Sequence, residues 1–216
     1  MKRILFFLII LILSCKNEKR YHDEVNKDRA TVVDITSNDY LKEIEQHRDS
    51  INNLFRDSEA SPLTDEDRKA FKDLDFFPAD SSYRVKARFV RTPNEKSFLM
   101  PTTTDRKAVY TKYGELHFKL VNKDYKLNIY QNTEIILTEG YEDYLFLPFT
   151  DLTNGEQTYG GGRYIDMRIP DNDTITIDFN KAYNPYCTYN KKYSCPIVPG
   201  ENDLDIEIRA GVKDFE

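Results

Sequence analysis

The sequence predicts a mainly β protein (α+β): an antiparallel curled sheet, barrel- or sandwich-like, with two N-terminal helices packed against it. Up to about residue 75 the apolar side chains recur at helical spacing. From Tyr83 onward they alternate with polar ones, the pattern of half-buried strands. The gaps between these strands are short, which favours antiparallel neighbours because parallel pairs need long crossovers. A chain of 216 residues is expected to hold one globular domain, at 38–216.

The composition excludes several classes of protein. Acidic side chains outnumber basic ones by 37 to 31, for a formal charge of −6. This argues against a nucleic-acid partner, because such binding draws its affinity from clustered Lys and Arg. The chain is 39% hydrophobic and 31% charged, so it can bury a core but is too polar for a multi-spanning membrane protein.

The first 14 residues are expected to be a signal peptide. Lys2 and Arg3 precede ten apolar residues, which are too few to span a bilayer of about 30 Å. The Ile-Leu-Ser-Cys sequence that ends at Cys15 resembles the lipobox of bacterial lipoproteins, although Leu13 departs from the residue types commoner there. The resemblance implies acyl chains on Cys15 and an anchor in a lipid bilayer. The alternative is a signal cut elsewhere, with Cys15 left free.

Residues 15–37 are interpreted as the lipidated cysteine and a flexible tether. The segment is polar and mixes basic with acidic side chains, so it cannot bury enough apolar surface to order itself. Lys16 and Glu18 loosely resemble the surface-export signals of some Bacteroidota lipoproteins. We therefore expect a membrane-anchored lipoprotein of the cell envelope, facing the periplasm or the cell surface.

Residues 38–75 are expected to be helical. Ser37, Asn38 or Asp39 can cap a first helix, whose apolar stripe includes Ile44 and Ile51. His47 shares this stripe and is interpreted as a packed edge residue rather than a ligand. A second helix ends near residue 73, and Thr64 with Asp67 three residues later fits a capping box at its start.

Residues 83–213 are expected to be β-rich. Turn-forming residues separate several of the alternating segments, at Gly114, 122–124 and 170–173. The expected strands cover residues 83–89, 108–113, 116–120, 125–131, 145–149, 163–169, 174–179 and 204–209.

Several blocks carry a family resemblance. The main ones are LFLPF at 145–149, YGGGRYID at 159–166 and DFNKAYNPYC at 178–187. With shorter matches at 61–63, 76–78, 194–196, 201–202 and 209–211, they resemble the signature of domain of unknown function 1684, a family of uncharacterised bacterial and archaeal proteins. The resemblance covers roughly 41–213. The family has no established activity or ligand, so the resemblance implies a family and not a function.

The two strands that flank the turn at 170–173 are expected to pair as a hairpin. Pairing Ile169 with Ile175 places the apolar side chains of both strands on one face. In that register Asp166 lies directly opposite Asp178 on the other face. Like charges directly opposite each other are destabilising, so this pair needs compensation.

Arg163, Arg168 or a bound divalent cation can compensate the opposed carboxylates. A shared proton can do the same, and it raises one pKa and creates a general acid or base. Asp166 and Asp178 are therefore the candidate catalytic residues of a hydrolase-type enzyme. The alternative is a solvated face on which Arg168 and water screen both charges. We predict no resident cofactor and no dedicated metal site.

The polar face and the following loop also contain a candidate ligand site. Aromatic faces beside amide side chains suit polar ligands with apolar faces, such as sugars. The alternative is tyrosines that pack over a sheet edge. The leading hypothesis is a binding or envelope-associated module for a polar small molecule or glycan, with the hydrolase and a purely structural envelope protein as alternatives. The candidate ligand-binding residues are Arg163, Tyr164, Arg168, Asn180, Tyr183, Asn184 and Tyr186.

Two further features precede and follow these strands. Gly160, Gly161 and Gly162 either make a bulge or close backbone crossing, or form an anion site with the adjacent Arg163; they do not match a nucleotide-binding motif. Cys187 and Cys195 are an even pair in an exported chain and are expected to form a disulfide. Metal binding by these cysteines is the alternative, and it lacks further ligands.

Overall fold

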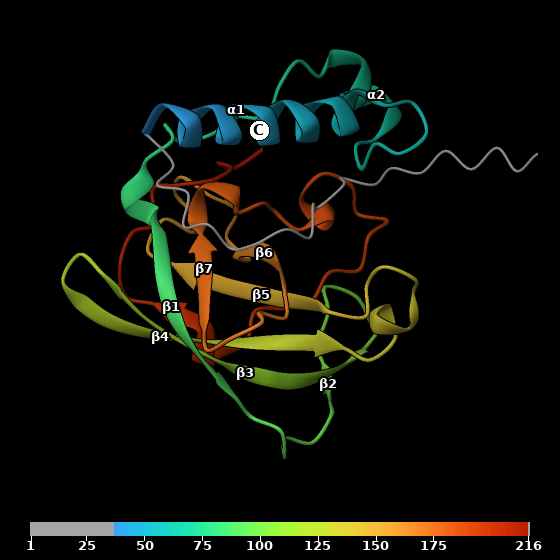
Figure 1. The fold of residues 1–216 in the computed structure, drawn as a ribbon. Coiled ribbons are helices and arrows are strands. Elements are labelled where there is room, and N and C mark those ends of the chain that lie inside the picture. The colour runs from blue at the N-terminus through green and yellow to red at the C-terminus, as the bar shows by residue number, and fades with distance from the viewer. Residues whose placement is uncertain (1–36, 216) are drawn as a thin grey trace, which may run out of the picture. The chain divides into compact units, whose positions relative to one another are not determined.

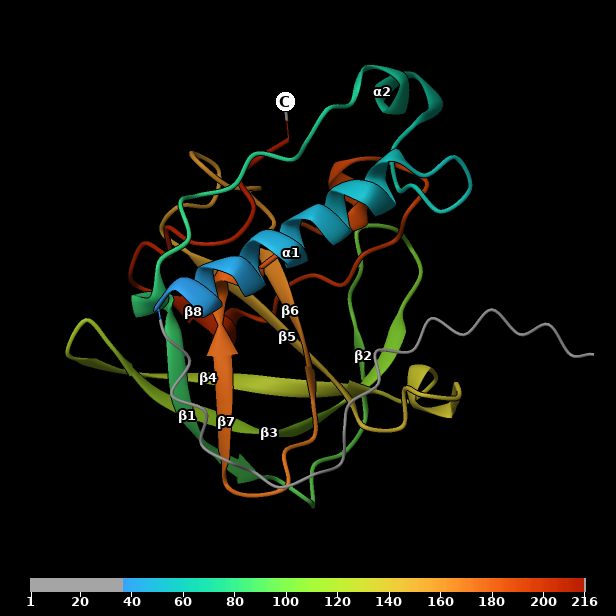
Figure 2. The same ribbon diagram turned by 45° about the horizontal axis from the view of Figure 1, so that its top comes forward.

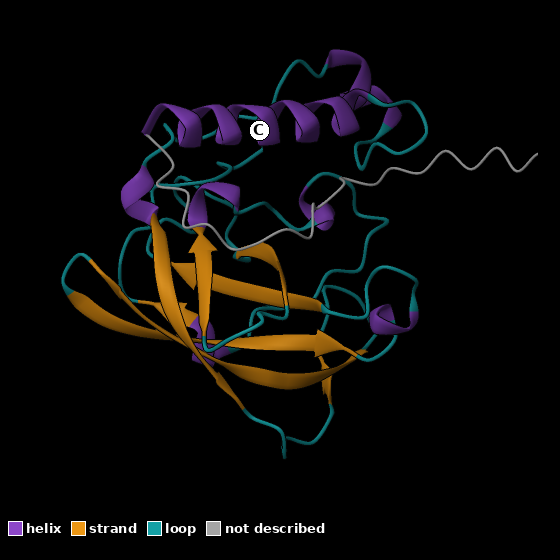
Figure 3. Cartoon of the chain, viewed as in Figure 1, coloured by secondary structure: helices purple, strands orange, loops and turns teal. Residues whose placement is uncertain are grey.

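The computed structural model describes residues 37–215, and they confirm the mainly β fold (Figures 1 and 3). The predicted signal peptide, the lipidation site at Cys15 and almost all of the predicted tether lie outside the described residues. Residues 35–216 form one compact unit. The described elements are α1 (Ser37–Arg56), α2 (Asp65–Ala70), β1 (Arg84–Arg91), β2 (Phe98–Met100), β3 (Ala108–Leu120), β4 (Lys123–Asn132), β5 (Tyr144–Asp151), β6 (Arg163–Arg168), β7 (Thr174–Asp178) and β8 (Asp203–Leu204), with five short 3-10 turns.

Both helices form where the sequence predicts them. α1 buries one stripe, which includes Tyr40, Ile44 and Phe55. The Thr64 side chain accepts a hydrogen bond from the Asp67 N–H and so caps α2. α2 ends at Ala70, three residues earlier than predicted, because Phe71 turns into an extended conformation and packs on Phe55 with 5.7 Å between ring centroids. Neither helix in residues 37–215 is long and apolar enough to cross a bilayer.

The strands form one strongly curled sheet in the order β6-β5-β4-β3-β1-β7 (Figures 1 and 2). Neighbours in this order are antiparallel, β2 adds to β3, and β8 pairs with β5 in parallel. Both views show α1 lying across one end of the curled sheet, beside the ends of β1 and β7.

Three details of the strands differ from the prediction. The expected turn at Gly114 is a bulge inside the single long strand β3, where a Cβ would lie 2.5 Å from the Phe89 ring. The short strand β2 was not predicted. Of the expected strand 204–209 only Leu204 lies in a strand, the two-residue β8, and residues 205–215 after it are irregular; we call them the C-terminal strap.

The predicted hairpin of β6 and β7 is wrong. These strands lie at opposite ends of the strand order, where β6 pairs with β5 and β7 pairs with β1. Asp166 lies opposite Phe146, and Asp178 lies opposite Arg84. Both strands still turn their apolar side chains into the same core. The alternation therefore determined which face points inward, but it carried no information on which strand is the neighbour.

Among residues 37–215, three hydrophobic clusters hold the fold together. The largest fills the inside of the curled sheet and includes Leu127, Leu147 and Phe179. A second lies on the opposite face of β3 to β6 and is built largely of aromatic rings, among them Phe146. The third joins α1 to the C-terminal strap, where Phe55 packs with its neighbours. The candidate site lies between the second and third clusters.

Candidate functional site

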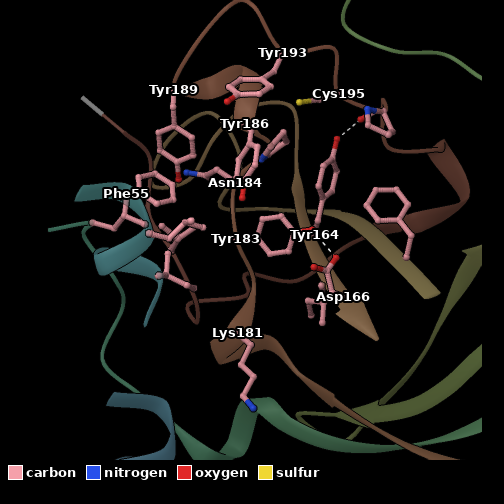
Figure 4. Close-up of a pocket in the computed structure, with 18 of the residues that line it drawn as sticks. Phe55, Tyr164, Asp166, Lys181, Tyr183, Asn184, Tyr186, Tyr189, Tyr193 and Cys195 are labelled. Atoms are coloured by element: carbon pink, nitrogen blue, oxygen red, sulfur yellow. Dashed lines mark hydrogen bonds between the residues drawn. The ribbon is translucent and has the colours of Figure 1, made fainter. Parts of the chain in front are cut away.

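A cavity of about 470 Å³ lies between α1, the outer face of β5 and β6, and the segment 181–196 (Figure 4). Its volume is in the range of small-molecule sites. Most of its wall is aromatic or aliphatic. We call it the tyrosine pocket, and its lining includes His47, Ile51, Phe55, Tyr110, Tyr144, Phe146, Tyr164, Asp166, Lys181, Tyr183, Asn184, Tyr186, Tyr189, Tyr193, Cys195 and Val212.

Strand register places the first tyrosines in the pocket. Side chains alternate between the two faces of a strand, so Tyr144 and Phe146 leave β5 on the outer face, as do Tyr164 and Asp166 on β6. A two-way backbone bridge then fixes Tyr183 beside Tyr164, with their rings edge to face at 5.9 Å. The pocket is thus a continuation of the sheet's outer aromatic face.

Asp166 is the acidic group of the pocket. Its Oδ1 accepts hydrogen bonds from the hydroxyls of Tyr144 (2.7 Å) and Tyr183 (2.6 Å). Burial, and then the charge of Asp166, raises the pKa of both phenols above its usual value, so both stay protonated and continue to donate. Within residues 37–215 no side chain donates to Oδ2, and no basic side chain pairs with Asp166.

Two buried polar atoms in the pocket wall have no partner among the described residues. Asn184 is fully buried; its Nδ2 donates to the Lys213 carbonyl (2.8 Å), while its Oδ1 accepts nothing. The Nε2 of His47 is also buried and unpaired. Leaving a buried polar atom unpaired costs about 1–3 kcal/mol, so such atoms point to a bound ligand or water. Burial and the nearby Lys181 lower the pKa of His47, which makes it neutral near pH 7.

Cys187 and Cys195 lie together at one side of the pocket. Both are free thiols in this structure, so the predicted disulfide is not confirmed. The Cys187 N–H donates to the Cys195 Sγ at 3.1 Å. A hydrogen bond from the Cys195 thiol lowers the pKa of Cys187 to about 6, and the same bond, together with burial, raises that of Cys195. Residues 37–215 contain no group of three or more His, Cys, Asp or Glu placed to hold a metal ion.

Asp178 and Asn180 lie outside the tyrosine pocket, in a structural network under α1. The Asp178 Oδ1 accepts hydrogen bonds from the Tyr40 hydroxyl (2.9 Å) and from the Asn180 backbone and side chain. Asn180 also donates to the Asp80 carbonyl. Because Asp178 does not face Asp166 across a strand pair, the opposed carboxylates on which the hydrolase alternative depended do not form.

Arg163 lies outside the tyrosine pocket. Its side chain is fully buried, and it pairs with Asp151 at 2.8 Å. It also donates to the carbonyls of Ile208, Ala210 and Val212, and so it holds the C-terminal strap. Its guanidinium is therefore not available to assist an anion at the preceding glycines. The preceding glycines make a close backbone crossing instead, since a Cβ on Gly162 (φ +89°) would lie 2.6 Å from the Phe149 carbonyl.

Arg168 also lies outside the tyrosine pocket. It forms an exposed ion pair with Asp143 at 2.6 Å and donates to the Gly140 carbonyl. Of the candidate ligand-binding residues, Tyr164, Tyr183, Asn184 and Tyr186 line the tyrosine pocket, as does the candidate catalytic residue Asp166.

The contributions of α1 and β5 to this site were not predicted. His47 has the same helical spacing as Ile44 and Ile51, and that stripe was interpreted as packing alone. Tyr144 directly precedes the predicted strand 145–149, and strand parity alone could have placed it beside Phe146. No local signal indicates that these segments meet the loop at 181–196.

The comparisons with known proteins point to one family. The profile of the family described as "Protein of unknown function (DUF1684)" matches residues 69–213. The chain is also similar to an uncharacterised protein of Haloarcula marismortui whose structure was determined by solution NMR; the two are 32% identical, the TM-score is 0.64, and the match covers 82% of this chain and 95% of that one. Among curated proteins nothing matches. The chain therefore belongs to the DUF1684 family.

Proposed function

We propose that this protein is a lipid-anchored binding module of the cell envelope, and that its tyrosine pocket takes a small ligand with an apolar face and a polar edge. One observation carries the proposal: the wall of an aromatic pocket holds a fully buried amide oxygen, that of Asn184, which has no partner within residues 37–215. Aromatic walls with a few polar groups that fix orientation are typical of small-molecule sites.

Binding can be tested with the compact unit 35–216, which contains all three hydrophobic clusters. A fragment library of polar aromatic compounds and sugars is screened by NMR. We expect hits that shift pocket resonances, and we expect Tyr186→Ala to weaken their binding about fivefold, because stacking on an aromatic ring is worth about 1 kcal/mol. Tyr186 is 37% exposed, so its removal leaves the core intact. Tyr113→Ala, outside the pocket, is the matched control; equal loss in both variants would contradict the proposal.

The anchor is proposed from the N-terminal sequence. A basic front, an apolar stretch too short to span a bilayer and the lipobox-like Cys15 support it. In a bacterial host that processes lipoproteins, we expect the wild-type chain to sediment with membranes and to carry the mass of its acyl chains. Cys15→Ser is expected to lose the added mass and to leave the membrane fraction. Cys195→Ser should stay with the membranes. Sedimentation of the Cys15→Ser chain would contradict lipid anchoring.

We also propose that Cys187 and Cys195 are joined by a disulfide in the exported protein. Their closeness and the low pKa of Cys187 support it. The Cys187 thiolate can attack the disulfide of a thiol oxidant, and Cys195 then displaces that oxidant from the mixed disulfide, which releases it as a reduced dithiol. Reduction is expected to lower the free energy of unfolding by about 2.5 kcal/mol, the value expected for a loop of this length. The variant with serine at both positions should not respond to reductant. Two free thiols, at Cys187 and Cys195, found by mass in protein purified from the membrane fraction would contradict the disulfide.

A further inference from the structure

We infer that the tyrosine pocket selects an organic ammonium ion: a primary or secondary amine, protonated at pH 7, on a flat apolar body. The inference deepens the proposed binding function and depends on it. It is carried by the charge of Asp166, by the aromatic rings around it and by the kind of polar atom that the pocket leaves unpaired.

Asp166 is an exposed carboxylate at the edge of the pocket, and no basic side chain among the described residues forms an ion pair with it. The hydroxyls of two half-buried tyrosines donate to Oδ1 and fix the carboxylate, and because these donors are neutral they leave its net charge in place. Oδ2 has no donor among residues 37–215. A cation bound there gains a charge-assisted hydrogen bond to an oriented acceptor.

The aromatic rings around Asp166 also favour a positively charged ligand. The face of an aromatic ring is the negative side of its quadrupole and attracts a cation within roughly 6 Å of the ring centre. Tyr164 and Tyr183 lie directly beside Asp166 (Figure 4). Tyr186 and Tyr193 pack against each other at 5.3 Å on the same wall of the pocket. An apolar body attached to the cation can stack on these rings.

The basic groups near the pocket do not reverse its charge. The ammonium of Lys181 bonds to the Glu43 carboxylate at 2.7 Å, and Figure 4 shows it directed away from the tyrosines. His47 is neutral because it is buried close to Lys181. An anionic ligand would therefore meet Asp166 without a free cation to offset it.

The unpaired oxygen atoms indicate a ligand that donates hydrogen bonds. Asn184 Oδ1 accepts nothing, and it lies on the Tyr189 side of the pocket, away from Asp166 (Figure 4). Both available oxygens, that of Asn184 and Oδ2 of Asp166, are acceptors. A protonated amine with at least one further N–H or O–H donor satisfies both, whereas a quaternary ammonium ion has no N–H to donate.

The test uses three probes of similar shape and different charge on the compact unit 35–216. They are phenethylamine (cation), 2-phenylethanol (neutral) and 3-phenylpropionate (anion), titrated at pH 7 and followed by NMR shifts of pocket residues. We expect phenethylamine to bind at least about tenfold tighter than 2-phenylethanol, and we expect 3-phenylpropionate to bind weakest. Raising the salt concentration should weaken only the amine.

Two variants test whether Asp166 supplies the negative charge that selects the amine. Asp166→Asn is expected to remove the tenfold advantage of the amine and to leave 2-phenylethanol binding unchanged, which also reports that the pocket is intact. Asp171→Asn removes an exposed carboxylate outside the pocket and should change neither probe. The inference is overturned if the amine and the alcohol bind equally, or if Asp166→Asn keeps the preference. In that case the proposed binding function would still stand if the alcohol or a sugar binds and Tyr186→Ala weakens that binding. If no probe shifts any pocket resonance, both the ammonium preference and the proposed function are overturned.

Discussion

Replacing Arg163 with alanine is expected to lower the free energy of unfolding by about 3–5 kcal/mol. The guanidinium and its partner Asp151 are both fully buried, so the variant leaves one buried carboxylate without its counter-ion. It also removes the donors from three carbonyls of the C-terminal strap, at 208, 210 and 212. Urea unfolding of the compact unit 35–216 measures the change.

A matched control comes from the same strand. Arg168→Ala breaks an ion pair with Asp143 in which both side chains are about half exposed, and such pairs are worth about 0–1 kcal/mol. Limited proteolysis should cut the strap in the Arg163→Ala chain and spare it in the control. A loss below about 1 kcal/mol for Arg163→Ala would show that other contacts hold the strap.

Arg163 also shows what strand alternation can and cannot reveal. It shares parity with Ile165 and Met167, so the alternation alone already pointed it inward. Arg163 was instead predicted to be a ligand-binding neighbour of the three glycines. Its partner Asp151 sits at the end of β5, and no sequence pattern indicates that pairing. The inward direction of the Arg163 side chain was predictable, whereas its partner Asp151 could be identified only from the fold.

The helices and strands were predicted correctly where the sequence signal is local. The Thr64 cap, the apolar stripe of α1 and the alternation in β1 each depend on neighbouring residues only. The pairing of β6 with β7 failed because it is a long-range property. A strand that buries one face can take any neighbour that buries the same face, and β7 forms its ladder with β1 rather than with β6.

The candidate site was predicted in part for the same reason. The tyrosines and Asn184 sit close together in sequence, and the chemistry of their side chains alone indicates a ligand surface. Asp166 was selected for an opposed partner that does not exist, yet it lies in the pocket among those tyrosines. The wall formed by α1 joins the site from more than a hundred residues away, which composition and spacing cannot reveal.

Gly211→Ala is expected to cost about 2–4 kcal/mol, because it combines backbone strain with overpacking. Gly211 has φ +79°, and an added Cβ would lie 2.6 Å from the Ala182 carbonyl oxygen and 2.8 Å from that of Phe179. Gly140→Ala separates the two effects: its φ is +84°, but no atom lies within 4 Å of the new Cβ. Gly140→Ala should therefore lower the free energy of unfolding through backbone strain alone, by about 1–2 kcal/mol. Equal losses in urea unfolding would show that the strap yields to the added methyl group.

The same substitution connects the strap to the tyrosine pocket. Val212, the next residue, lines the pocket and donates its N–H to the Ala182 carbonyl at 3.0 Å. Lys213 accepts the Nδ2 hydrogen of Asn184, which fixes the direction of the unpaired amide oxygen. A strap displaced by the Gly211→Ala clash must move both residues. We therefore expect Gly211→Ala to weaken phenethylamine binding under conditions where the chain is still folded, while Gly140→Ala leaves it unchanged. Unaltered binding in the Gly211→Ala chain would mean that the strap does not shape the pocket wall at Val212.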